Sequence, residues 1–302
     1  MYGITRKFVS KVAVLWLLTC LVLVPSLALA GEKAPTAGEI KRGAVASAKQ
    51  TAQDIQAKLS QEAIEAVADT HKALTLLDQG KVDEAVKVLQ DAIGKLEVVL
   101  SANPDLAYVP INVSTVAFDL VAEPDTIKKT LKEVKKLLDE GRVQDARRLL
   151  NTLQSEIDII VEKLPLATYP DSIKLAVKYI ANGKIEEAKA ILSAALSSIV
   201  QDVIVIPLPI VRADILIQAA SKIAKTEKEK AIELLNRAEK QLKVAKLLGY
   251  GKEYGAEYED LLKRIEALKK EIKGKNESKK MFEDLLEKIK AFRKHFEPNE
   301  KK

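Results

Sequence analysis

The sequence predicts a mainly α-helical protein of helical hairpins, with a small β element of three short strands and a charged helical hairpin at its C-terminus. Three observations lead to this fold class. Apolar residues recur at helical spacing over most of the chain, three glycines mark turns between helices, and a β-branched segment with a proline follows each of the first three hairpins. Charged residues of both signs make up 30% of the chain, which is typical of solvated helix faces.

Residues 1–30 are expected to be a signal peptide. Three basic residues, Arg6, Lys7 and Lys11, accompany an apolar run over residues 12–24, and a small-residue cleavage pattern ends at Ala30, with Gly31 as the new first residue. The run is shorter than the roughly 20 residues of a membrane span. The mature protein is therefore expected to be exported to the periplasm without a stable membrane span. An uncleaved N-terminal anchor is the alternative.

Cleavage removes Cys20, the only cysteine, so the mature chain has neither a disulfide nor a thiol nucleophile. It also removes three basic residues, which lowers the net charge from +6 to +3. The remaining basic groups are mixed with acidic ones and are not interleaved with aromatic residues. Nucleic-acid binding is therefore not expected.

The mature chain is expected to have three parts. Residues 31–43 are polar and are predicted to be a flexible lead-in. Residues 44–224 are predicted to form a helical body of three αα-hairpin units, and residues 225–302 a charged helical C-terminal region.

The three hairpins share one turn pattern, a glycine followed five residues later by an alanine. Glycine can end a helix in the left-handed conformation, and the small alanine lets the next helix approach closely. The pairs are Gly80 and Ala85, Gly141 and Ala146, and Gly183 and Ala188. A degenerate fourth copy follows residue 224, with Ala231 in the alanine position. The alanines are 61, 42 and 43 residues apart, so a tetratricopeptide array with its period of 34 is not expected.

The segments 108–118, 157–165 and 202–209 are predicted to be strands of one small sheet. They are rich in β-branched residues, the first alternates with a period of two, and each contains a proline, which strand ends tolerate and helix interiors do not. The alternative is that they are apolar helix ends broken by proline. The middle segment is the most ambiguous, because its apolar residues also continue the spacing of the helix before it.

After residue 251 the sequence predicts two amphipathic helices joined at residues 274–278. Their apolar stripes are narrow and need either each other or a partner. The stripes are Leu261, Ile265, Leu268 and Ile272 in the first helix, and Phe282, Leu285, Ile289 and Phe292 in the second. Together with the amphipathic body, they predict a homo-oligomer, a dimer or tetramer, with the body as its interface and this tail as an accessory.

No group of residues indicates catalysis, a metal site or a cofactor. The two histidines, His71 and His295, lack metal-ligand spacing, and no nucleophile or phosphate-binding motif is present. Tyr169, between Thr168 and Pro170, is either a turn residue packed on the core or a wall of a ligand groove. Arg212 lies among aliphatic residues, where it either pairs with an acid or anchors an anion. Asp119 is the candidate partner for that pair.

The segments "DARRLLNTLQSEIDI", "LPLATYP", "IPLPIVRADIL" and "LLGYGKEY" resemble the YfdX family of exported bacterial proteins. The resemblance spans roughly residues 45–270. It implies a mainly helical protein associated with bacterial stress responses, including acid and multidrug stress. The family supplies no catalytic residues to carry over.

The expected function is therefore that of an exported, non-enzymatic binding or interaction protein. One form is a chaperone-like protein or scaffold that binds unfolded client proteins through apolar surface. Another is a receptor for small hydrophobic molecules, built around Tyr169 and Arg212. A third alternative, an enzyme of unknown reaction, has no motif in its favour.

Overall fold

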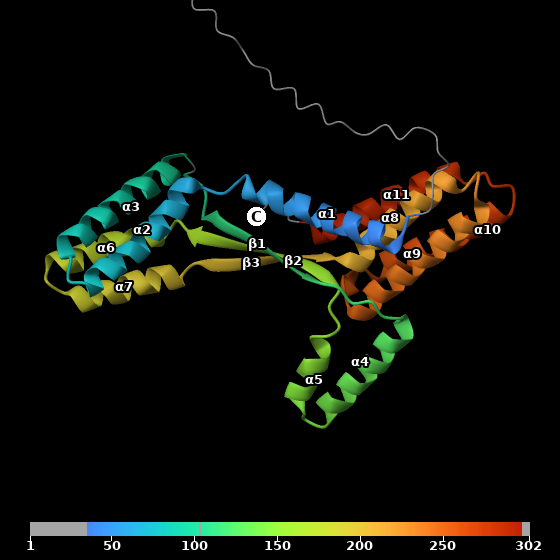
Figure 1. The fold of residues 1–302 in the computed structure, drawn as a ribbon, viewed down its shortest axis with the longest axis horizontal. Coiled ribbons are helices and arrows are strands. Elements are labelled where there is room, and N and C mark those ends of the chain that lie inside the picture. The colour runs from blue at the N-terminus through green and yellow to red at the C-terminus, as the bar shows by residue number, and fades with distance from the viewer. Residues whose placement is uncertain (1–34, 103, 298–302) are drawn as a thin grey trace, which may run out of the picture. The chain divides into compact units, whose positions relative to one another are not determined.

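The structure is a computed structural model that describes residues 35–102 and 104–297. The expected signal peptide, including Ala30 and Gly31, lies outside these residues. Within them the chain forms eleven α-helices and three strands (Figure 1). The helices are α1 (Ala37–Gln56), α2 (Gln61–Asp78), α3 (Val82–Ala102), α4 (Pro124–Asp139), α5 (Val143–Leu150), α6 (Tyr169–Ala181), α7 (Ile185–Ser197), α8 (Leu208–Ile223), α9 (Lys228–Leu248), α10 (Gly255–Lys273) and α11 (Lys279–Arg293). The strands are β1 (Tyr108–Phe118), β2 (Glu156–Pro165) and β3 (Val200–Pro207), and two short 3₁₀ turns, η1 (Lys252–Tyr254) and η2 (Lys294–Phe296), flank α10 and α11.

A helical hairpin precedes each strand, so that α2, α3 and β1 are followed by α4, α5 and β2 and then by α6, α7 and β3. The strands form one antiparallel sheet in the order β1-β2-β3. The predicted fold class, mainly helical with three short strands, is therefore confirmed, and the alternative of broken helix ends is wrong. The ambiguous middle segment is divided, because α5 ends at Leu150 and β2 begins at Glu156.

The prolines mark the points where strands give way to helices. Pro165 and Pro207 are the last residues of β2 and β3, and Pro170 and Pro209 lie in the first turn of α6 and α8. Proline suits both places because it has no N–H to donate and its φ is close to the helical value. Pro110 lies beside an irregularity in the β1–β2 register, where a missing donor is tolerated.

The turn glycines adopt the left-handed conformation, with φ of 71° at Gly80, 73° at Gly141 and 71° at Gly183. At the first turn the N–H of Lys81 donates to the carbonyl of Leu76 at 2.9 Å, which closes the helix end. The alanines five residues after the glycines are fully buried between their helices: Ala85, Ala146 and Ala188. The local pattern of the sequence and the three-dimensional turn agree at all three hairpins.

Two helical bundles hold most of the apolar core. The first bundle consists of α2, α3, α6 and α7, and Val109 and Ile111 of β1 join its core. The second bundle consists of α8, α9, α10 and α11. The α4–α5 hairpin has only a small cluster of its own, around Val134, Leu137 and Ala146.

The sequence placed the start of the charged helical C-terminal region at residue 225. That boundary falls in the turn between α8 and α9, which pack together in the second bundle. Ala231, the alanine of the degenerate fourth hairpin, is fully buried there. All eight residues of the apolar stripes on α10 and α11 are buried in the same core. The tail therefore offers no free stripe for an oligomer interface.

The expected flexible lead-in is also partly wrong, because α1 begins at Ala37. Thr36 caps the helix by accepting from the N–H of Glu39 at 3.2 Å, and the Glu39 side chain accepts from the N–H of Thr36 at 2.6 Å. The helix packs small residues against one face of the sheet. This core contains Ala44, Ala48 and Ala52 of α1 with Ile157, Ile159 and Val161 of β2.

Among the described residues, no helix combines the length and apolar character needed to cross a membrane.

Candidate functional site

Among the residues that the structure describes, no helix packs over the face of the sheet opposite α1. Side chains alternate along a strand, so Asp158, Ile160 and Glu162 of β2 point away from the core that Ile157 and Ile159 form with α1. In the register, Ser114 and Val203 flank Ile160, and Val116 and Val205 flank Asp158. We call these seven residues the open sheet face: Ser114, Val116, Asp158, Ile160, Glu162, Val203 and Val205.

The open sheet face combines apolar side chains on β1 and β3 with a column on β2 that contains the carboxyl groups of Asp158 and Glu162. Val116 is 42% exposed and Val203 is 53% exposed, on the two strands that flank β2. Glu162, at one end of the column, accepts from Asn112 Nδ2 at 3.2 Å and from Gln201 Nε2 at 3.0 Å. The surface can therefore contact an apolar partner in the middle and hydrogen-bond or pair with cations along β2.

Two carboxyl groups at the start of β2 lack ion pairs with any residue that the structure describes. Burial raises the pKa of Glu156, the nearby Asp158 raises it further, and a hydrogen bond with the Tyr250 hydroxyl opposes the shift. Burial also raises the pKa of Asp158, whose Oδ1 is buried without a hydrogen-bond partner in the described chain. Both groups therefore hold a proton at higher pH than ordinary carboxyls do.

Tyr250 ties this end of the sheet to the second bundle. Its hydroxyl accepts from the N–H of Ser155 at 2.9 Å, and its carbonyl accepts from the Tyr258 hydroxyl at 2.8 Å. Burial raises the pKa of Tyr250, and Glu156 adds to the shift, so the phenol stays neutral. The contact with Ser155 positions the start of β2.

Arg212 pairs with the acid that the sequence proposed for it. Its Nη2 lies 2.6 Å from Asp119 Oδ1, and Lys41 Nζ lies 3.0 Å from Asp119 Oδ2. Burial opposes ionisation of Asp119, but the hydrogen bonds from Arg212 and Lys41 outweigh it and lower the pKa of Asp119. The trio joins α1, the end of β1 and α8. Because the guanidinium of Arg212 is already paired with Asp119, it is not a free site for another anion.

Tyr169 is a core residue of the first bundle and has no exposed surface. Burial raises the pKa of its phenol to about 12, and the side chain of Thr70 opposes the shift. Its hydroxyl finds no hydrogen-bond partner at bonding distance among the described residues. Thr70 itself donates to the carbonyl of Ala66 at 2.8 Å. Tyr169 therefore begins α6 and packs on the core, and it does not line an open groove.

Tyr169 and Arg212 are not brought together. Tyr169 belongs to the core of the first bundle, whereas Arg212 lies on α8, which belongs to the second. The small-molecule receptor expected around these two residues therefore lacks its shared pocket.

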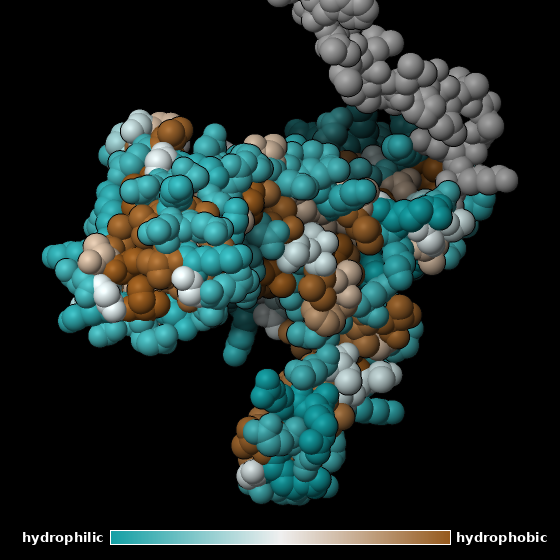
Figure 2. All heavy atoms as spheres, turned by 60° about the vertical axis from the view of Figure 1, so that its left-hand side comes forward, coloured by the Kyte–Doolittle hydropathy of each residue, from teal (hydrophilic) through white to brown (hydrophobic). Residues whose placement is uncertain are grey.

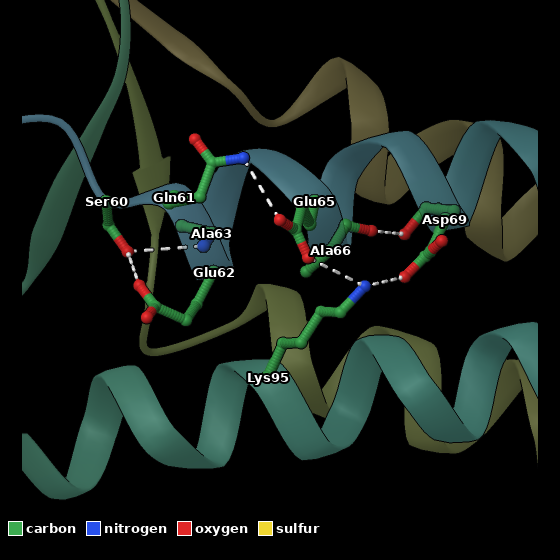
Figure 3. Close-up of polar contacts among 9 residues, drawn as sticks. Ser60, Gln61, Glu62, Ala63, Glu65, Ala66, Asp69 and Lys95 are labelled. Carbon is green, nitrogen blue, oxygen red and sulfur yellow. Dashed lines mark hydrogen bonds and ion pairs between the residues drawn. The ribbon is translucent and has the colours of Figure 1, made fainter.

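Figure 3 shows a polar cluster on α2 and α3, in which the Lys95 ammonium lies between two carboxylates. Lys95 Nζ is 2.6 Å from Asp69 Oδ2 and 3.2 Å from Glu65 Oε2. The hydrogen bond to Asp69 is the main reason that the pKa of Lys95 is raised, so the amine stays protonated. Ser60 caps α2 by accepting from the N–H of Ala63 at 3.2 Å. A lysine held charged in this way is not a nucleophile, and the cluster fastens α2 to α3.

Comparison with known proteins gives one family. Residues 66–205 match the model of the YfdX protein family. The similarity to the YfdX family covers just under half of the chain. The YfdX region begins inside α2 and ends inside β3, so it contains all three hairpin–strand units except their outer ends. It is shorter than the resemblance over residues 45–270 suggested, and it leaves out α1 and the second bundle.

A solved structure of YfdX from Salmonella Typhi is similar to half of this chain. Its sequence is 18% identical, the match covers 50% of this chain and 93% of that one, and the TM-score is 0.35. No curated protein matches the chain.

Sequence reasoning missed the open sheet face and the carboxyl pair beside Tyr250. A signal for the carboxyl pair was present, since Glu156 and Asp158 alternate with isoleucines in a strand-forming segment. Their alternation predicts that they share a face, but only the strand order shows that this face is left without a helix.

Proposed function

We propose that this protein is an exported, non-enzymatic binding protein that holds other polypeptides, in the manner of a chaperone or scaffold. The observation that supports it best is the open sheet face. The two helical bundles bury large apolar cores, yet valines of β1 and β3 stay exposed around Ile160. Exposed apolar residues that polar groups surround are typical of interaction sites.

The face of the molecule drawn in Figure 2 is consistent with the same proposal. Figure 2 shows a mostly hydrophilic face on which hydrophobic residues gather in patches, one of them on the bundle of α2, α3, α6 and α7. The Arg212–Asp119 pair and the Lys95 cluster are explained by structural roles.

The test is the suppression of aggregation of a chemically unfolded client protein. Val116→Lys and Val203→Lys place a charge in the open sheet face and are expected to weaken suppression severalfold. Val121→Lys is the matched control, since Val121 is 89% exposed in the segment between β1 and α4, outside this face. Equal suppression by all three variants and the original protein would contradict the proposal. A screen of hydrolase and transferase activities is the second test. Enzymatic turnover that one point mutation abolishes would also contradict the proposal.

Export is the second part of the proposal. Mass spectrometry of the protein from a native or related host is expected to find Gly31 as the first residue. If protein with an intact Met1 is found in the membrane fraction, the protein is membrane-anchored and this part of the proposal is wrong.

Self-association is the third part. The α4–α5 hairpin exposes Leu138, Val143 and Leu150 around a core of three buried residues. So small a core buries little apolar surface to stabilise the hairpin. A dimer or tetramer that covers this hairpin is expected at micromolar concentration. Light scattering coupled to size exclusion measures it, and a monomer mass at high concentration would reject it.

A further inference from the structure

The outer edge of β1 runs beside α1 over its whole length. At one end, Lys41 of α1 pairs with Asp119. This residue directly follows Phe118, the last residue of β1. At the other end, the N–H of Ser60, which follows α1, donates to the carbonyl of Pro110 at 3.2 Å. The helix and the strand are therefore antiparallel, and contacts fix them to each other at both ends.

Between these ends, α1 covers the central strand and leaves β1 partly bare. The alanines of α1 pack on Ile157, Ile159 and Val161 of β2. Thr115 and Ala117, the register partners of Ile159 and Ile157, face the same side of the sheet, yet both are exposed. The helix is thus displaced from β1 toward β2.

The displacement leaves a groove of about 340 Å³ between α1 and β1. Apolar residues form most of its lining, and Lys49 is its one charged lining residue. It is lined by Val45, Ala48, Lys49, Ala52, Gln53 and Gln56 of α1, by Val113, Ser114, Thr115 and Ala117 of β1, and by Ile157 of β2.

The two edges of the sheet differ in their chemistry. The β3 edge carries Asp202, which pairs with Lys163 of β2. The β1 strand has no charged residue from Tyr108 to Phe118. Charges on an edge strand discourage pairing with another chain, whereas a long uncharged edge invites it. The edge beside the groove is therefore the one open to a further strand.

We infer that this groove binds an extended segment of a partner polypeptide as a fourth strand, paired with β1 and lying alongside α1. The inference deepens the proposed function and rests on it. The unpaired backbone N–H and C=O groups of an edge strand are complementary to another strand, and neither a helix nor a small apolar molecule satisfies them.

The groove also sets the chemistry of the segment. Residues 112–118 span about 23 Å at the rise of a strand, which corresponds to a segment of six or seven residues. Alternate side chains of that segment point toward α1, where Ala48, Ala52 and Ala117 leave room for small or branched apolar groups. Lys49 favours a neutral or acidic segment over a basic one.

A second copy of this chain fits the groove less well. Two β1 strands paired antiparallel around a twofold axis place both α1 helices on the same face of the joined sheet. Each helix then brings Lys49 toward a groove that already contains Lys49, and like charges repel. The partner is therefore a different polypeptide segment.

The test uses a fluorescent eight-residue peptide of alternating threonine and valine with one terminal glutamate. A control peptide has two of its threonines replaced by proline, which cannot donate to a strand ladder. The full-length mature protein is expected to bind the first peptide saturably, one to one, and the proline peptide at least tenfold more weakly. Equal binding of the two peptides, or binding of neither, overturns the inference.

A pair of variants locates the site. Ala117→Arg places a long cation in the groove and is expected to weaken peptide binding about tenfold. Ala181→Arg, at an exposed alanine at the end of α6, is expected to leave it unchanged. Circular dichroism checks that both variants fold. If Ala117→Arg does not fold, the inference is still tested by comparing how the two peptides bind to the original protein.

The remaining outcomes separate this inference from the proposed function. Suppression of client aggregation without binding of the alternating peptide overturns the groove and leaves the proposed function standing. Peptide binding without suppression supports the groove and contradicts the proposed function. An oligomer that Ala117→Arg dissociates, with no peptide bound, identifies a second copy as the occupant and overturns the inference.

Discussion

Burial decides the role of the single residues that stand out in this chain. Tyr169 has a ring in the core of the first bundle and a hydroxyl without a partner among the described residues. Arg212 is held by Asp119, and Lys95 by Asp69 and Glu65. Glu156 and Asp158 differ from these, because burial raises their pKa values and neither has an ion pair with a described residue.

Removal of the Tyr169 hydroxyl is expected to leave the stability of the protein undiminished. Tyr169→Phe keeps the ring in the core and deletes a buried polar atom that has no partner, so the free energy of unfolding is expected to stay the same or rise by up to about 1 kcal/mol. Tyr169→Ala leaves a cavity and is expected to cost about 3–5 kcal/mol. Urea unfolding measures both. A Phe variant destabilised by more than about 1 kcal/mol would mean that the hydroxyl is hydrogen-bonded.

Glu156 is expected to make the folded protein less stable as pH rises. Because its pKa is raised in the folded state, the folded state binds more protons than the unfolded state between the two pKa values. The contribution of Glu156 is therefore most favourable below the unfolded pKa of about 4.3, and it declines as pH rises through the folded pKa.

The Glu156→Gln variant removes this decline. It is expected to have a higher thermal midpoint than the original protein at pH 7 and the same midpoint near pH 3.5. Glu133→Gln, at an exposed residue of α4, is the control. Melting curves from pH 3.5 to 8 measure the difference, and a Glu156→Gln midpoint that is lower at pH 7 would contradict the sign of the pKa shift.

At the scale of elements, the three hairpins show that local chemistry sets the turns. Each turn has the glycine in the left-handed region and the alanine buried between the helices. At Gly80, Gly141 and Gly183 an added Cβ would meet nothing within 4 Å. The requirement for glycine is therefore one of backbone conformation, and crowding plays no part.

Gly141→Val tests this requirement. A β-branched residue at φ of 73° is expected to cost about 1–3 kcal/mol of stability through backbone strain. Gly94→Ala is the matched control, because Gly94 lies inside α3 with nothing within 4 Å of an added Cβ, and it is expected to gain about 0.4–1 kcal/mol. Thermal melts measure both. An unchanged midpoint in Gly141→Val would show that the turn tolerates a side chain.

At the scale of the whole molecule, the C-terminal helices complete a core that the earlier chain begins. Asp214 of α8 is buried and lies 2.5 Å from Arg293 of α11, and Arg293 also donates to Ser47 of α1 at 2.9 Å. Lys269 of α10 lies 2.6 Å from Glu239 of α9. These polar contacts and the shared apolar core make α10 and α11 part of the fold of α8 and α9.

Deleting residues 253–302 is therefore expected to destabilise the chain that remains. The deletion uncovers the faces of α8 and α9 that α10 and α11 bury, and it leaves Asp214 without Arg293. A lower thermal midpoint and aggregation on heating are expected. Deleting only residues 298–302 is the control. A truncated chain as stable as the original would show that the tail is an appendage after all.

The sequence by itself determined the features that depend on neighbours along the chain. Helical spacing located the hairpins, glycine and alanine located their turns, and the β-branched segments with their prolines located the strands. It also proposed the Arg212–Asp119 pair, whose two members lie 93 residues apart. These predictions succeeded because a local conformational preference, or an isolated charge that needs an opposite one, is written in the residue types themselves.

Only the tertiary structure decided which surfaces meet. The apolar stripes of α10 and α11 fit an oligomer interface as well as an internal core, because a stripe shows that a helix needs a partner and does not say which one. Residues 37–43 of the expected lead-in became part of α1, and Tyr169 became a core residue, for the same reason. The open sheet face exists because none of the described helices packs over the side of the sheet opposite α1. The groove exists because α1 packs on the central strand and leaves β1 partly uncovered. Both are outcomes of packing that no local pattern contains.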